Sequence, residues 1–325
     1  MASAAPILHV IRSGLVESVH LGHVAVCTPN GTITAALGDP GRMLFARSSM
    51  KPLQAAVSLS CAGDDVSDEE LAIMCASHNG EPVHVRAVRR VLRRAGLPSD
   101  ALRCPPGWPL DMESAARVRS PRPELFNCSG KHAGMLLACV RRGWDLSTYP
   151  RSAHPLQRRV RSAVLDATGR EVVRIGVDGC GVPVHGMPLS AMAMLFARLA
   201  APERLGDLAG QVARCTSAMR AHPYLVAGRS RTDTAIMEVS PDLVVKTGAE
   251  GLACAAWLSE DLGIAVRVED GGERASGPAM IRALSLIGAL SPAEVRKLAP
   301  IAKRPVLGGG RRVGDMVAGF ELRRR

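Results

Sequence analysis

The sequence predicts an α+β protein with an antiparallel sheet built from both ends of the chain and a helical layer built from its middle. Strand-like segments fill the first forty residues and return between residues 242 and 270. Helical patterns dominate the residues between these segments, and another covers residues 274–290. Strands at the two ends with helices between them are typical of an α+β chain, and we expect one domain over residues 1–325.

The first forty residues predict three strands. Residues 7–14, 16–27 and 33–38 contain many of the β-branched residues that favour an extended backbone. The sequence TPNGT separates the second segment from the third, and its Asn-Gly pair is typical of a tight hairpin turn. We therefore expect the second and third strands to pair antiparallel.

A helix is expected over residues 49–63. Its pattern is apolar, and Pro52 is compatible with a helix only in the first turn. Ser48 or Ser49 stands where a capping hydroxyl is preferred, so we expect one of them to cap the helix.

A second helix is expected over residues 67–78, where Ser67 and Glu70 have the spacing of a capping box. Amphipathic patterns continue along the middle of the chain. Further helices are expected over 82–97, 130–143, 154–169, 274–290 and two segments between 190 and 220.

The remaining segments predict loops and strands. Residues 100–130 are rich in proline and predict a loop. Residues 171–190 predict a strand followed by glycine-rich turns. Residues 242–259 and 263–270 predict two strands around a turn.

Composition narrows the class of protein. The chain has 325 residues, of which 47% are hydrophobic, so it can bury a large core. It contains no run of 18 uncharged apolar residues, so we expect no membrane-spanning helix. The first twenty residues lack the basic start and long apolar stretch of a signal peptide, and we therefore expect a cytoplasmic protein. The nine cysteines form no CxxC pair and are expected to be reduced thiols, mostly in the core.

The formal net charge of +11 raises the alternative of a nucleic-acid-binding protein. The arginines, however, stand in short helical clusters that suit solvated helix faces. Aromatic residues make up only 3% of the chain, so few side chains could stack on bases. We expect no nucleic-acid partner.

Lysine is rare in this chain, with five lysines among 41 basic residues. One of them, Lys51, stands three residues after Ser48 at the start of an expected helix, so both would lie on one face. A desolvated lysine can remove the proton of a serine hydroxyl, whereas an arginine stays protonated. By itself this spacing is common, and a capping serine beside a surface lysine explains it equally well.

Two further motifs strengthen the hydrolase interpretation. Lys246 lies in LVVKTGAEG, in a predicted strand with apolar surroundings, and a buried lysine needs a partner. Ser77 lies in CASHNGEP, between these two lysines in the sequence. Ser-x-x-Lys, Ser-His-Asn and Lys-Thr-Gly therefore occur in the order of the three motifs of serine β-lactamases and penicillin-binding proteins, with His78 where Asp is usual.

Polar residues near these motifs are candidates to bind a polar substrate. They are Arg47, Asn79, Glu81 and His84. Ser77 itself has an alternative role in a turn that ends a helix before Gly80.

Two cysteines could form a metal site. Cys128 stands near Lys131 and His132 at one helix start, and Cys180 follows Asp178 in a glycine-rich turn. Thiolate sulfur with nitrogen or carboxylate ligands suits Zn²⁺. The spacing matches no standard zinc module, so two cysteines buried in glycine-rich turns remain an alternative.

Six separated segments together resemble the L-asparaginase II family of the Rhizobium etli type. They are RSSMKPLQA, SHNGEPVH, NCSGKHAGML, GVDGCGVPV, HPYLVAGRSRTDTAIM and KTGAEG. The resemblance covers nearly the whole chain. It implies a fold similar to that of serine β-lactamases and penicillin-binding proteins, hydrolysis of L-asparagine to L-aspartate and ammonia, and a homodimer.

The resemblance also implies roles for individual residues. It matches two Ser–Lys pairs, Ser48 with Lys51 and Ser77 with Lys246, and we expect Ser48 to be the nucleophile. It matches a Zn²⁺ site at Cys128, Lys131 and Cys180, and the expected substrate contacts are Arg47, Asn79, Glu81, His132 and Asp178. A cytosolic serine hydrolase of the β-lactamase or peptidase kind, acting on another amide, remains the alternative.

Overall fold

The computed structural model describes residues 3–169 and 174–324 of the chain. The chain divides into two compact units, which are described separately. The sheet unit comprises residues 1–49, 187–201 and 235–325, and the helical unit comprises residues 50–186 and 202–234. The expected single domain over 1–325 stays a prediction.

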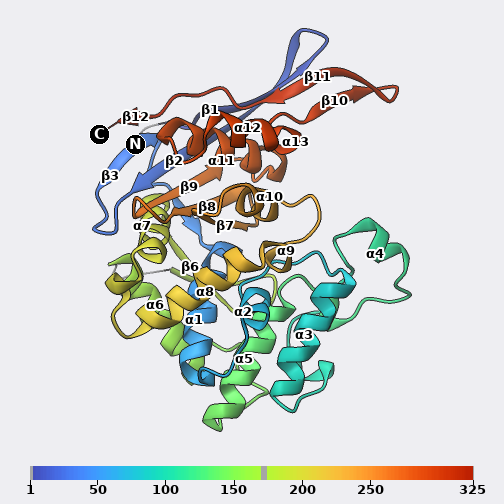
Figure 1. Ribbon diagram of the computed structural model, residues 1–325, viewed down its shortest axis with the longest axis vertical. Coiled ribbons are helices and arrows are strands. Elements are labelled where there is room, and N and C mark those ends of the chain that lie inside the picture. Colours follow the sequence, from blue (N-terminus) through green and yellow to red (C-terminus); the bar gives the residue numbers. More distant parts are fainter. Residues whose placement is uncertain (1–2, 170–173, 325) are drawn as a thin grey trace. The chain divides into compact units, whose positions relative to one another are not determined.

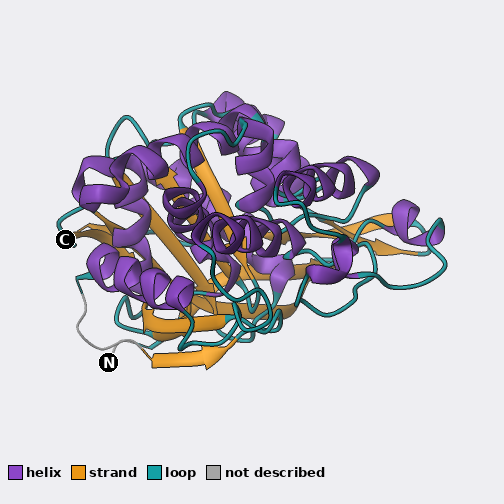
Figure 2. Cartoon of the chain, turned by 90° about the horizontal axis from the view of Figure 1, so that it is seen from below, coloured by secondary structure: helices purple, strands orange, loops and turns teal. Residues whose placement is uncertain are grey.

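The sheet unit is built on an antiparallel sheet to which both ends of the chain contribute (Figures 1 and 2). Its strands lie in the order β10-β11-β1-β2-β9-β8-β7, and β3 pairs with both β2 and β12. The strands are β1 (Ala5–Arg12), β2 (Leu15–Cys27), β3 (Ile33–Leu37), β7 (Leu243–Gly248), β8 (Leu252–Trp257), β9 (Leu262–Val268), β10 (Pro305–Gly308), β11 (Arg311–Val317) and β12 (Arg323–Arg324).

Helices cover both faces of this sheet (Figure 1). Helix α7 (Leu189–Ala200) and helix α11 (Glu273–Ile287) both pack against β8 and β9. Gly263 lets α7 approach closely, because a Cβ atom at this position would overlap the helix backbone at Ala193 and Ala197. The central strands are therefore buried on both sides, and β8 has five buried residues of six.

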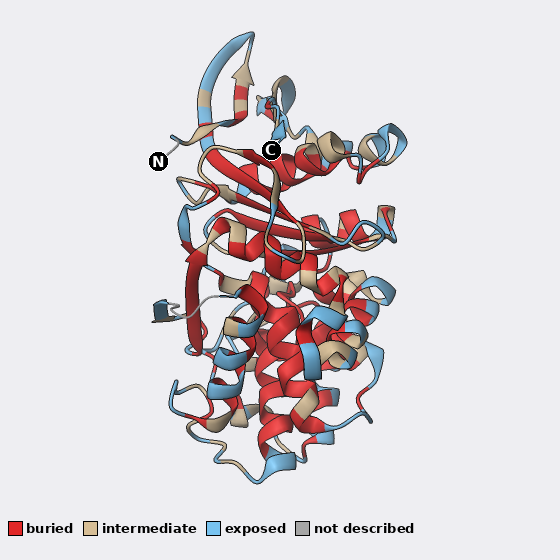
Figure 3. Ribbon diagram, turned by 90° about the vertical axis from the view of Figure 1, so that its left-hand side faces the viewer, coloured by how far each residue is buried: buried red, intermediate tan, exposed pale blue. Residues whose placement is uncertain are grey.

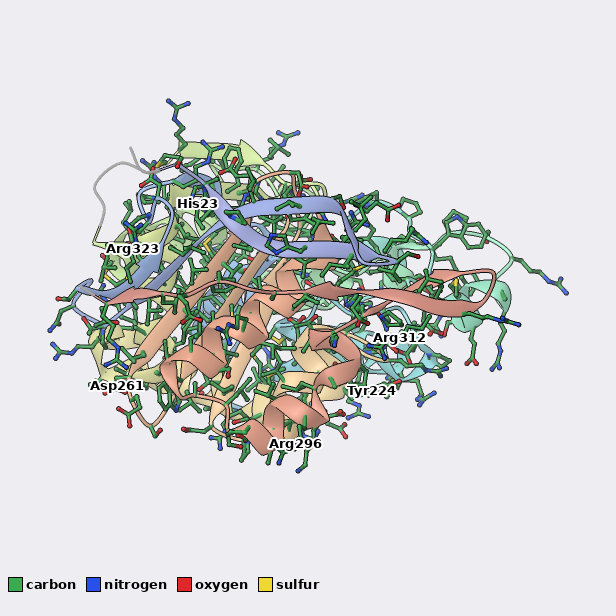
Figure 4. The ribbon with its side chains drawn as sticks, turned by 90° about the horizontal axis from the view of Figure 1, so that it is seen from above. His23, Tyr224, Asp261, Arg296, Arg312 and Arg323 are labelled. Atoms are coloured by element: carbon green, nitrogen blue, oxygen red, sulfur yellow. The ribbon has the colours of Figure 1, made fainter. Side chains whose placement is uncertain are left out.

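Side chains tie the long strand β2 to its neighbours. His23, labelled in Figure 4, has its Nε2 atom 2.6 Å from Glu269 Oε1 and accepts the backbone N–H of Asp39 at Nδ1. Arg42 donates to the same carboxylate from Nε and Nη2. This ion-paired cluster joins the start of the chain to the end of β9.

The helical unit is organised around helices α1 (Lys51–Ala62) and α5 (Ser129–Arg142), which pack against each other. Buried residues run through the helices of this unit (Figure 3), and α1 buries all but one of its 12 residues. The surrounding helices are α2 (Asp68–Met74), α3 (Pro82–Arg94), α4 (Met112–Ala116), α6 (Pro155–Thr168), α8 (Ala209–Ala221) and α9 (Pro223–Val226). The antiparallel strands β5 (Arg174–Val177) and β6 (Pro183–Pro188) form a hairpin.

The other elements are short. They are β4 (Met43–Phe45), α10 (Thr232–Val239), α12 (Pro292–Lys297), α13 (Ala299–Ala302) and the 3₁₀ turns η1 (Arg47–Met50), η2 (Ser99–Ala101), η3 (Pro123–Leu125) and η4 (Pro202–Leu208). None of the helices within the described part of the chain is long and apolar enough to cross a membrane.

The predicted α+β class is confirmed, with an antiparallel sheet and layers of helices. The three N-terminal strands and the hairpin between β2 and β3 form as expected. The Ser67–Glu70 capping box is present at the start of α2. The helices expected over 82–97, 130–143, 154–169, 274–290 and within 190–220 all form, with ends shifted by a few residues.

The predicted cap of the first long helix is wrong. Helix α1 begins at Lys51 with Met50 as its N-cap, and no side chain bonds to its first N–H groups. The Ser49 hydroxyl instead donates to the backbone carbonyl of Lys246, at 3.0 Å, within the sheet unit. A 3₁₀ turn over Arg47–Met50 precedes the helix and moves both serines away from the capping position.

Two segments contain more structure than the sequence predicted. The expected single strand over 242–259 is two strands, because Glu250 and Gly251 both have positive φ and form a tight turn between β7 and β8. The short helix α4 interrupts the loop expected over 100–130, and the Asp111 side chain caps it.

The C-terminal strands were not predicted. After α11 the chain forms the β10–β11 hairpin, in which Gly309 and Gly310 adopt the positive φ angles that a two-residue turn requires. Of the strand expected within 171–190, residues 171–173 lie outside the described residues, and β5 begins at Arg174.

Candidate active site

Lys51 and Ser77 form a buried polar pair in the helical unit. Lys51 is the first residue of α1, and its Nζ atom lies 2.8 Å from Ser77 Oγ. The same nitrogen lies 2.6 Å from the carbonyl oxygen of Ala76 and 3.5 Å from that of Asn127. Lys51 has no exposed surface, so its amine is held among protein groups within bonding distance.

Backbone hydrogen bonds position the segment that follows α2. Ser77 donates its N–H to Val226, and Asn79 donates its N–H to Ala227. The carbonyl of Asn79 accepts the N–H groups of Leu110 and Asp111. These bonds hold the backbone of residues 77–79 on both sides, and Ser77 lies beside Lys51.

Glu81 lies at the centre of a polar cluster beside this segment. Its carboxylate accepts the Tyr224 hydroxyl at 2.5 Å, the Arg229 backbone N–H at 3.1 Å and the Asn79 amide at 3.2 Å. Burial raises the pKa of Glu81, but the hydrogen bonds from these three donors lower it by more than burial raises it. The pKa of Glu81 therefore lies below its ordinary value. Glu81 is therefore a buried carboxylate that keeps its charge at neutral pH.

Gly228 makes room for the Glu81 cluster. Its φ angle is +113°, a conformation that residues with a side chain rarely adopt. A Cβ atom here would lie 2.5 Å from Glu81 Oε1, 2.8 Å from Asn79 Nδ2 and 2.9 Å from His84 Cε1. The glycine of the HPYLVAGR segment is thus required by both its backbone and its neighbours.

Two histidines near the pair are neutral. His78 accepts the Gly80 N–H at Nδ1, and its Nε2 lies 2.9 Å from Ser129 Oγ. Burial, and after it the neighbouring His84, hold the pKa of His78 well below its ordinary value. His84 stacks between the rings of His78 and Tyr224 and donates from Nε2 to the Tyr224 carbonyl.

Arg231 is a cation next to the site that the sequence did not single out. Its guanidinium donates to Asn79 Oδ1 at 3.1 Å, and its charge lowers the pKa of His78. Asn79 in turn donates to the Arg229 carbonyl, which holds the two segments together. The signal was available in the sequence, because Arg231 lies in the HPYLVAGRSRTDTAIM segment.

Cys128, Lys131 and Cys180 lie together in the helical unit, and all three are buried. Lys131 Nζ is 3.0 Å from Cys180 Sγ, and Cys180 Sγ is 3.5 Å from Asp178 Oδ2. The hydrogen bond from Cys128 and the charge of Lys131 lower the pKa of Cys180 to about 5 despite its burial, so Cys180 is a thiolate at neutral pH. Burial lowers the pKa of Lys131, but the two sulfurs raise it by more, so Lys131 keeps its proton.

Gly130 brings this cluster close to α2. A Cβ atom at Gly130 would overlap the backbone of Ile73, so only glycine lets the start of α5 approach α2 this closely. Within residues 3–169 and 174–324, no three His, Cys, Asp or Glu side chains are grouped so as to hold a metal ion. A metal at this place would need the Lys131 amine as one of its ligands.

Three further predicted site residues, Lys246, Arg47 and Ser48, lie in the sheet unit, whereas His132 is buried in the helical unit. Lys246 is fully buried on β7, where its Nζ donates to the Thr247 carbonyl at 2.8 Å. Arg47 has a positive φ angle of 44° and lies 3.7 Å from the Glu250 carboxylate. Ser48 is half-buried in η1.

The structure thus brings Lys51 into contact with Ser77. In the predicted pairs, Lys51 was matched with Ser48 and Ser77 with Lys246. Each of those pairs joins one residue of the helical unit to one of the sheet unit, and both stay predictions.

Comparison with known protein families identifies the family to which this chain belongs. A sequence profile of the L-asparaginase II family matches residues 8–318, and the chain therefore belongs to this family. A search of curated protein sequences finds no significant match.

Solved structures similar to this chain include three with low sequence identity. A β-lactamase from Mycobacterium bovis is 15% identical, with 86% of this chain and 95% of that chain covered and a TM-score of 0.43. Mglu in its glutamate form is 16% identical, with 81% of this chain and 60% of that chain covered and a TM-score of 0.38. Mglu in its native form in the presence of 4.3 M NaCl is 17% identical, with 89% of this chain and 66% of that chain covered and a TM-score of 0.38.

Proposed function

We propose that this protein hydrolyses the side-chain amide of L-asparagine to L-aspartate and ammonia. Membership of the L-asparaginase II family supports an amidohydrolase of this type. The observation that carries the proposal is the buried contact of 2.8 Å between Lys51 Nζ and Ser77 Oγ. A lysine without solvent contact, bonded to a serine hydroxyl, is suited to accept and return a proton.

The surroundings of Lys51 suit a neutral amine. A neutral amine has two N–H donors and one lone pair. The carbonyl oxygens of Ala76 and Asn127, at 2.6 Å and 3.5 Å, would take the two N–H groups. The lone pair would then accept the Ser77 hydroxyl hydrogen, and every polar group of the pair would be satisfied. Arginine could not replace this lysine, because a guanidinium offers no lone pair.

In the proposed mechanism Ser48 Oγ attacks the amide carbon, and Lys51 releases the Ser77 hydroxyl hydrogen and accepts the Ser48 proton with its lone pair. Ser77 passes its proton to the amide nitrogen as the C–N bond breaks, and Lys51 returns the proton taken from Ser48 to Ser77 Oγ. Ammonia then leaves. Water then attacks the acyl ester, L-aspartate leaves, and the Ser48 hydroxyl is restored. Splitting the reaction through a serine ester is the usual route for an activated hydroxyl. Lys246 is proposed to assist these proton transfers.

The substrate is a zwitterion with an ammonium, a carboxylate and an amide, so its site needs charges of both signs. Glu81 is proposed to bind the ammonium group, since its three donors keep it ionised. Asn79 lies beside Glu81 and is proposed to bind through its backbone or amide. Arg47, His132 and Asp178 are the other proposed contacts.

The cluster of Cys128, Lys131 and Cys180 is proposed to hold Zn²⁺. Two sulfur atoms, one of them already a thiolate, and an amine nitrogen are donors that zinc accepts. Lys131 would have to lose its proton to serve as a ligand. When bound, zinc would order the loops around Cys128 and Cys180 and attract an oxygen of the substrate. The homodimer and the cytoplasmic location stay predictions.

The test is ammonia release from L-asparagine by the purified protein, with L-glutamine measured in parallel. We expect release from L-asparagine well above that from L-glutamine, because the two substrates differ by one methylene and a fitted site discriminates against the longer one. Absence of release from either amide, by folded protein supplied with zinc, would contradict the proposal. β-Lactam substrates would then be tested next.

A further inference from the structure

Tyr149 connects a backbone N–H group to a histidine in the interior of the helical unit. The backbone N–H of Arg103 donates to the Tyr149 hydroxyl oxygen at 2.9 Å. The same oxygen lies 2.6 Å from His132 Nδ1. Tyr149 and His132 are both fully buried, and the carbonyl of Tyr149 is held by the Gln157 amide at 2.9 Å.

The direction of these hydrogen bonds determines where the His132 proton lies. The Tyr149 oxygen already accepts the Arg103 N–H, so its own hydrogen is available for His132. Burial raises the pKa of Tyr149, and the phenol keeps this hydrogen at any ordinary pH. His132 Nδ1 is therefore the acceptor, and a neutral ring must carry its proton on Nε2.

The resulting Nε2–H group has no acceptor within the described residues, although it is buried. A buried donor without an acceptor destabilises the folded protein, so native proteins contain few of them. The His132 ring interacts electrostatically with Lys131, Cys128, Lys51 and Asp178. His132 also follows Lys131, a proposed zinc ligand, directly along helix α5.

We propose that Tyr149 is a positioning residue, which holds His132 in the Nε2–H tautomer so that this N–H donates to an oxygen of the substrate. The identity of the substrate rests on the proposed function, whereas the tautomer does not. L-Asparagine carries carboxylate and amide oxygens, and either is the kind of acceptor that the N–H lacks. Tyr149 then acts through His132 and does not touch the substrate.

The first test is the tautomer itself, measured by ¹⁵N NMR of protein labelled at histidine. Signals of His132 are identified by their loss in a His132→Gln variant. We expect Nδ1 to show the shift of an unprotonated acceptor and Nε2 that of a protonated nitrogen. In Tyr149→Phe the donor to Nδ1 is gone, and the two tautomers should mix. Tyr224→Phe is the matched control, because it also removes one hydrogen-bonded tyrosine hydroxyl but should leave the His132 signals unchanged.

The second test is a double-mutant cycle on kcat/KM for L-asparagine. A glutamine amide can supply an N–H near the position of Nε2 and has no imidazole tautomer to set. Tyr149→Phe should lower kcat/KM about tenfold in the wild type, the worth of one hydrogen bond. In the His132→Gln background the same change should alter kcat/KM by less than about twofold, because the two residues act as one unit.

Several results would overturn the proposal. A protonated Nδ1 in the wild type would do so, as would equal losses from Tyr149→Phe in both backgrounds, which would mean a structural role only. If the Tyr149→Phe variant does not fold, the proposal is tested on the wild-type protein alone. Addition of L-aspartate should then shift the NMR signal of His132 Nε2. An unchanged signal with L-aspartate bound would contradict the proposal. A protein that shows the expected tautomer but no amidase activity would contradict the proposed function and leave the tautomer assignment standing.

Discussion

Lys51 Nζ lies 2.8 Å from Ser77 Oγ, and both side chains are buried in the helical unit. The contact links the first residue of α1 to the turn that follows α2. Two backbone carbonyls, of Ala76 and Asn127, share the same nitrogen. Lys51 is therefore placed to exchange a proton with Ser77, and the proposed reaction uses this path for the proton that reaches the leaving nitrogen.

Ser77→Ala should affect amides more than esters. We expect it to slow hydrolysis of L-asparagine by about 100-fold or more, the scale of a lost general acid. Hydrolysis of the β-methyl ester of L-aspartate should fall much less, because methanol leaves with less help from a proton than ammonia does. The measurement is kcat for both substrates. Equal losses on the amide and the ester would contradict the proton-donor role of Ser77.

Ser48→Ala should lose activity on both substrates, because the nucleophile serves each of them. The matched control is Ser58→Ala, which removes a buried serine hydroxyl of α1 that donates to the Gln54 carbonyl at 2.9 Å. This variant should keep both activities. If Ser48→Ala keeps more than about a tenth of the wild-type rate, Ser48 is not the nucleophile.

Cys180→Ser should lower the zinc content of the purified protein from about one ion per chain to a small fraction of that value. The reason is that Cys180 is the thiolate of the proposed site. Cys104→Ser is the control, since Cys104 is also buried but its Sγ contacts the Pro123 carbonyl at 3.6 Å. Elemental analysis by mass spectrometry measures the zinc. Wild-type protein that binds no zinc after incubation with the ion would refute the assignment.

Removal of zinc by a chelator tests its role in the reaction. We expect zinc-free protein to remain folded and to bind L-asparagine more weakly, because the proposed ion organises the site. Circular dichroism and steady-state kinetics measure the two effects. Complete loss of kcat, reversed by added zinc, would instead assign the metal a direct part in catalysis.

Gly228→Ala should disturb the Glu81 cluster. A Cβ atom here meets Glu81, Asn79 and His84 at 2.5–2.9 Å, and the φ angle of +113° adds strain. We expect a loss of about 1–3 kcal/mol in the free energy of unfolding and a lower kcat/KM. Gly206→Ala is the control, since Gly206 also has a positive φ, of 52°, but a Cβ there meets nothing within 4 Å. A variant at Gly228 as stable and active as the control would show that the cluster tolerates displacement.

His185 should make stability depend on pH. Burial first, and the charge of Arg161 second, lower the pKa of His185 to about 4. Above pH 6.5, the ordinary histidine pKa, the ring is neutral in both the folded and the unfolded chain and has no effect. As the pH falls from 6.5 to about 4, only the unfolded chain takes up this proton, so the free energy of unfolding decreases by about 1.4 kcal/mol per pH unit. Below about pH 4 both states bind it, and the contribution levels off.

His185→Leu should therefore flatten the decline in stability between pH 6.5 and 4. Neither ring nitrogen of His185 has a hydrogen-bond partner among the described residues, so the apolar replacement loses no bond. Urea unfolding at several pH values measures the slope. The comparison variant is His154→Leu, since His154 bonds through both nitrogens and burial shifts its pKa in the same direction. An unchanged slope in His185→Leu would contradict the assignment of this effect to His185.

Local patterns were sufficient to predict most elements. The Asn-Gly turn of the first hairpin and the capping box of α2 depend on neighbouring residues alone, and both formed as expected. The turns with two positive φ angles, at Glu250-Gly251 and Gly309-Gly310, were missed. Glutamate in the first of them is unusual, and the glycine run of the second does not by itself indicate which residues pair across it.

By itself, the sequence determined the α+β class and the family, because hydrophobic period, turn residues and motif order are properties of the chain. The candidate catalytic, substrate-binding and metal-binding residues stay predictions. The sequence also indicated that the few lysines of this arginine-rich chain are candidates for proton transfer. Only the tertiary structure decided which of these residues meet. Lys51 contacts Ser77 because the 77–79 segment is held by backbone N–H groups that donate to the carbonyls of Val226 and Ala227. Spacing along the chain carries no record of such contacts. The tautomer of His132 likewise depends on Tyr149 and on the N–H of Arg103, groups that only folding brings together.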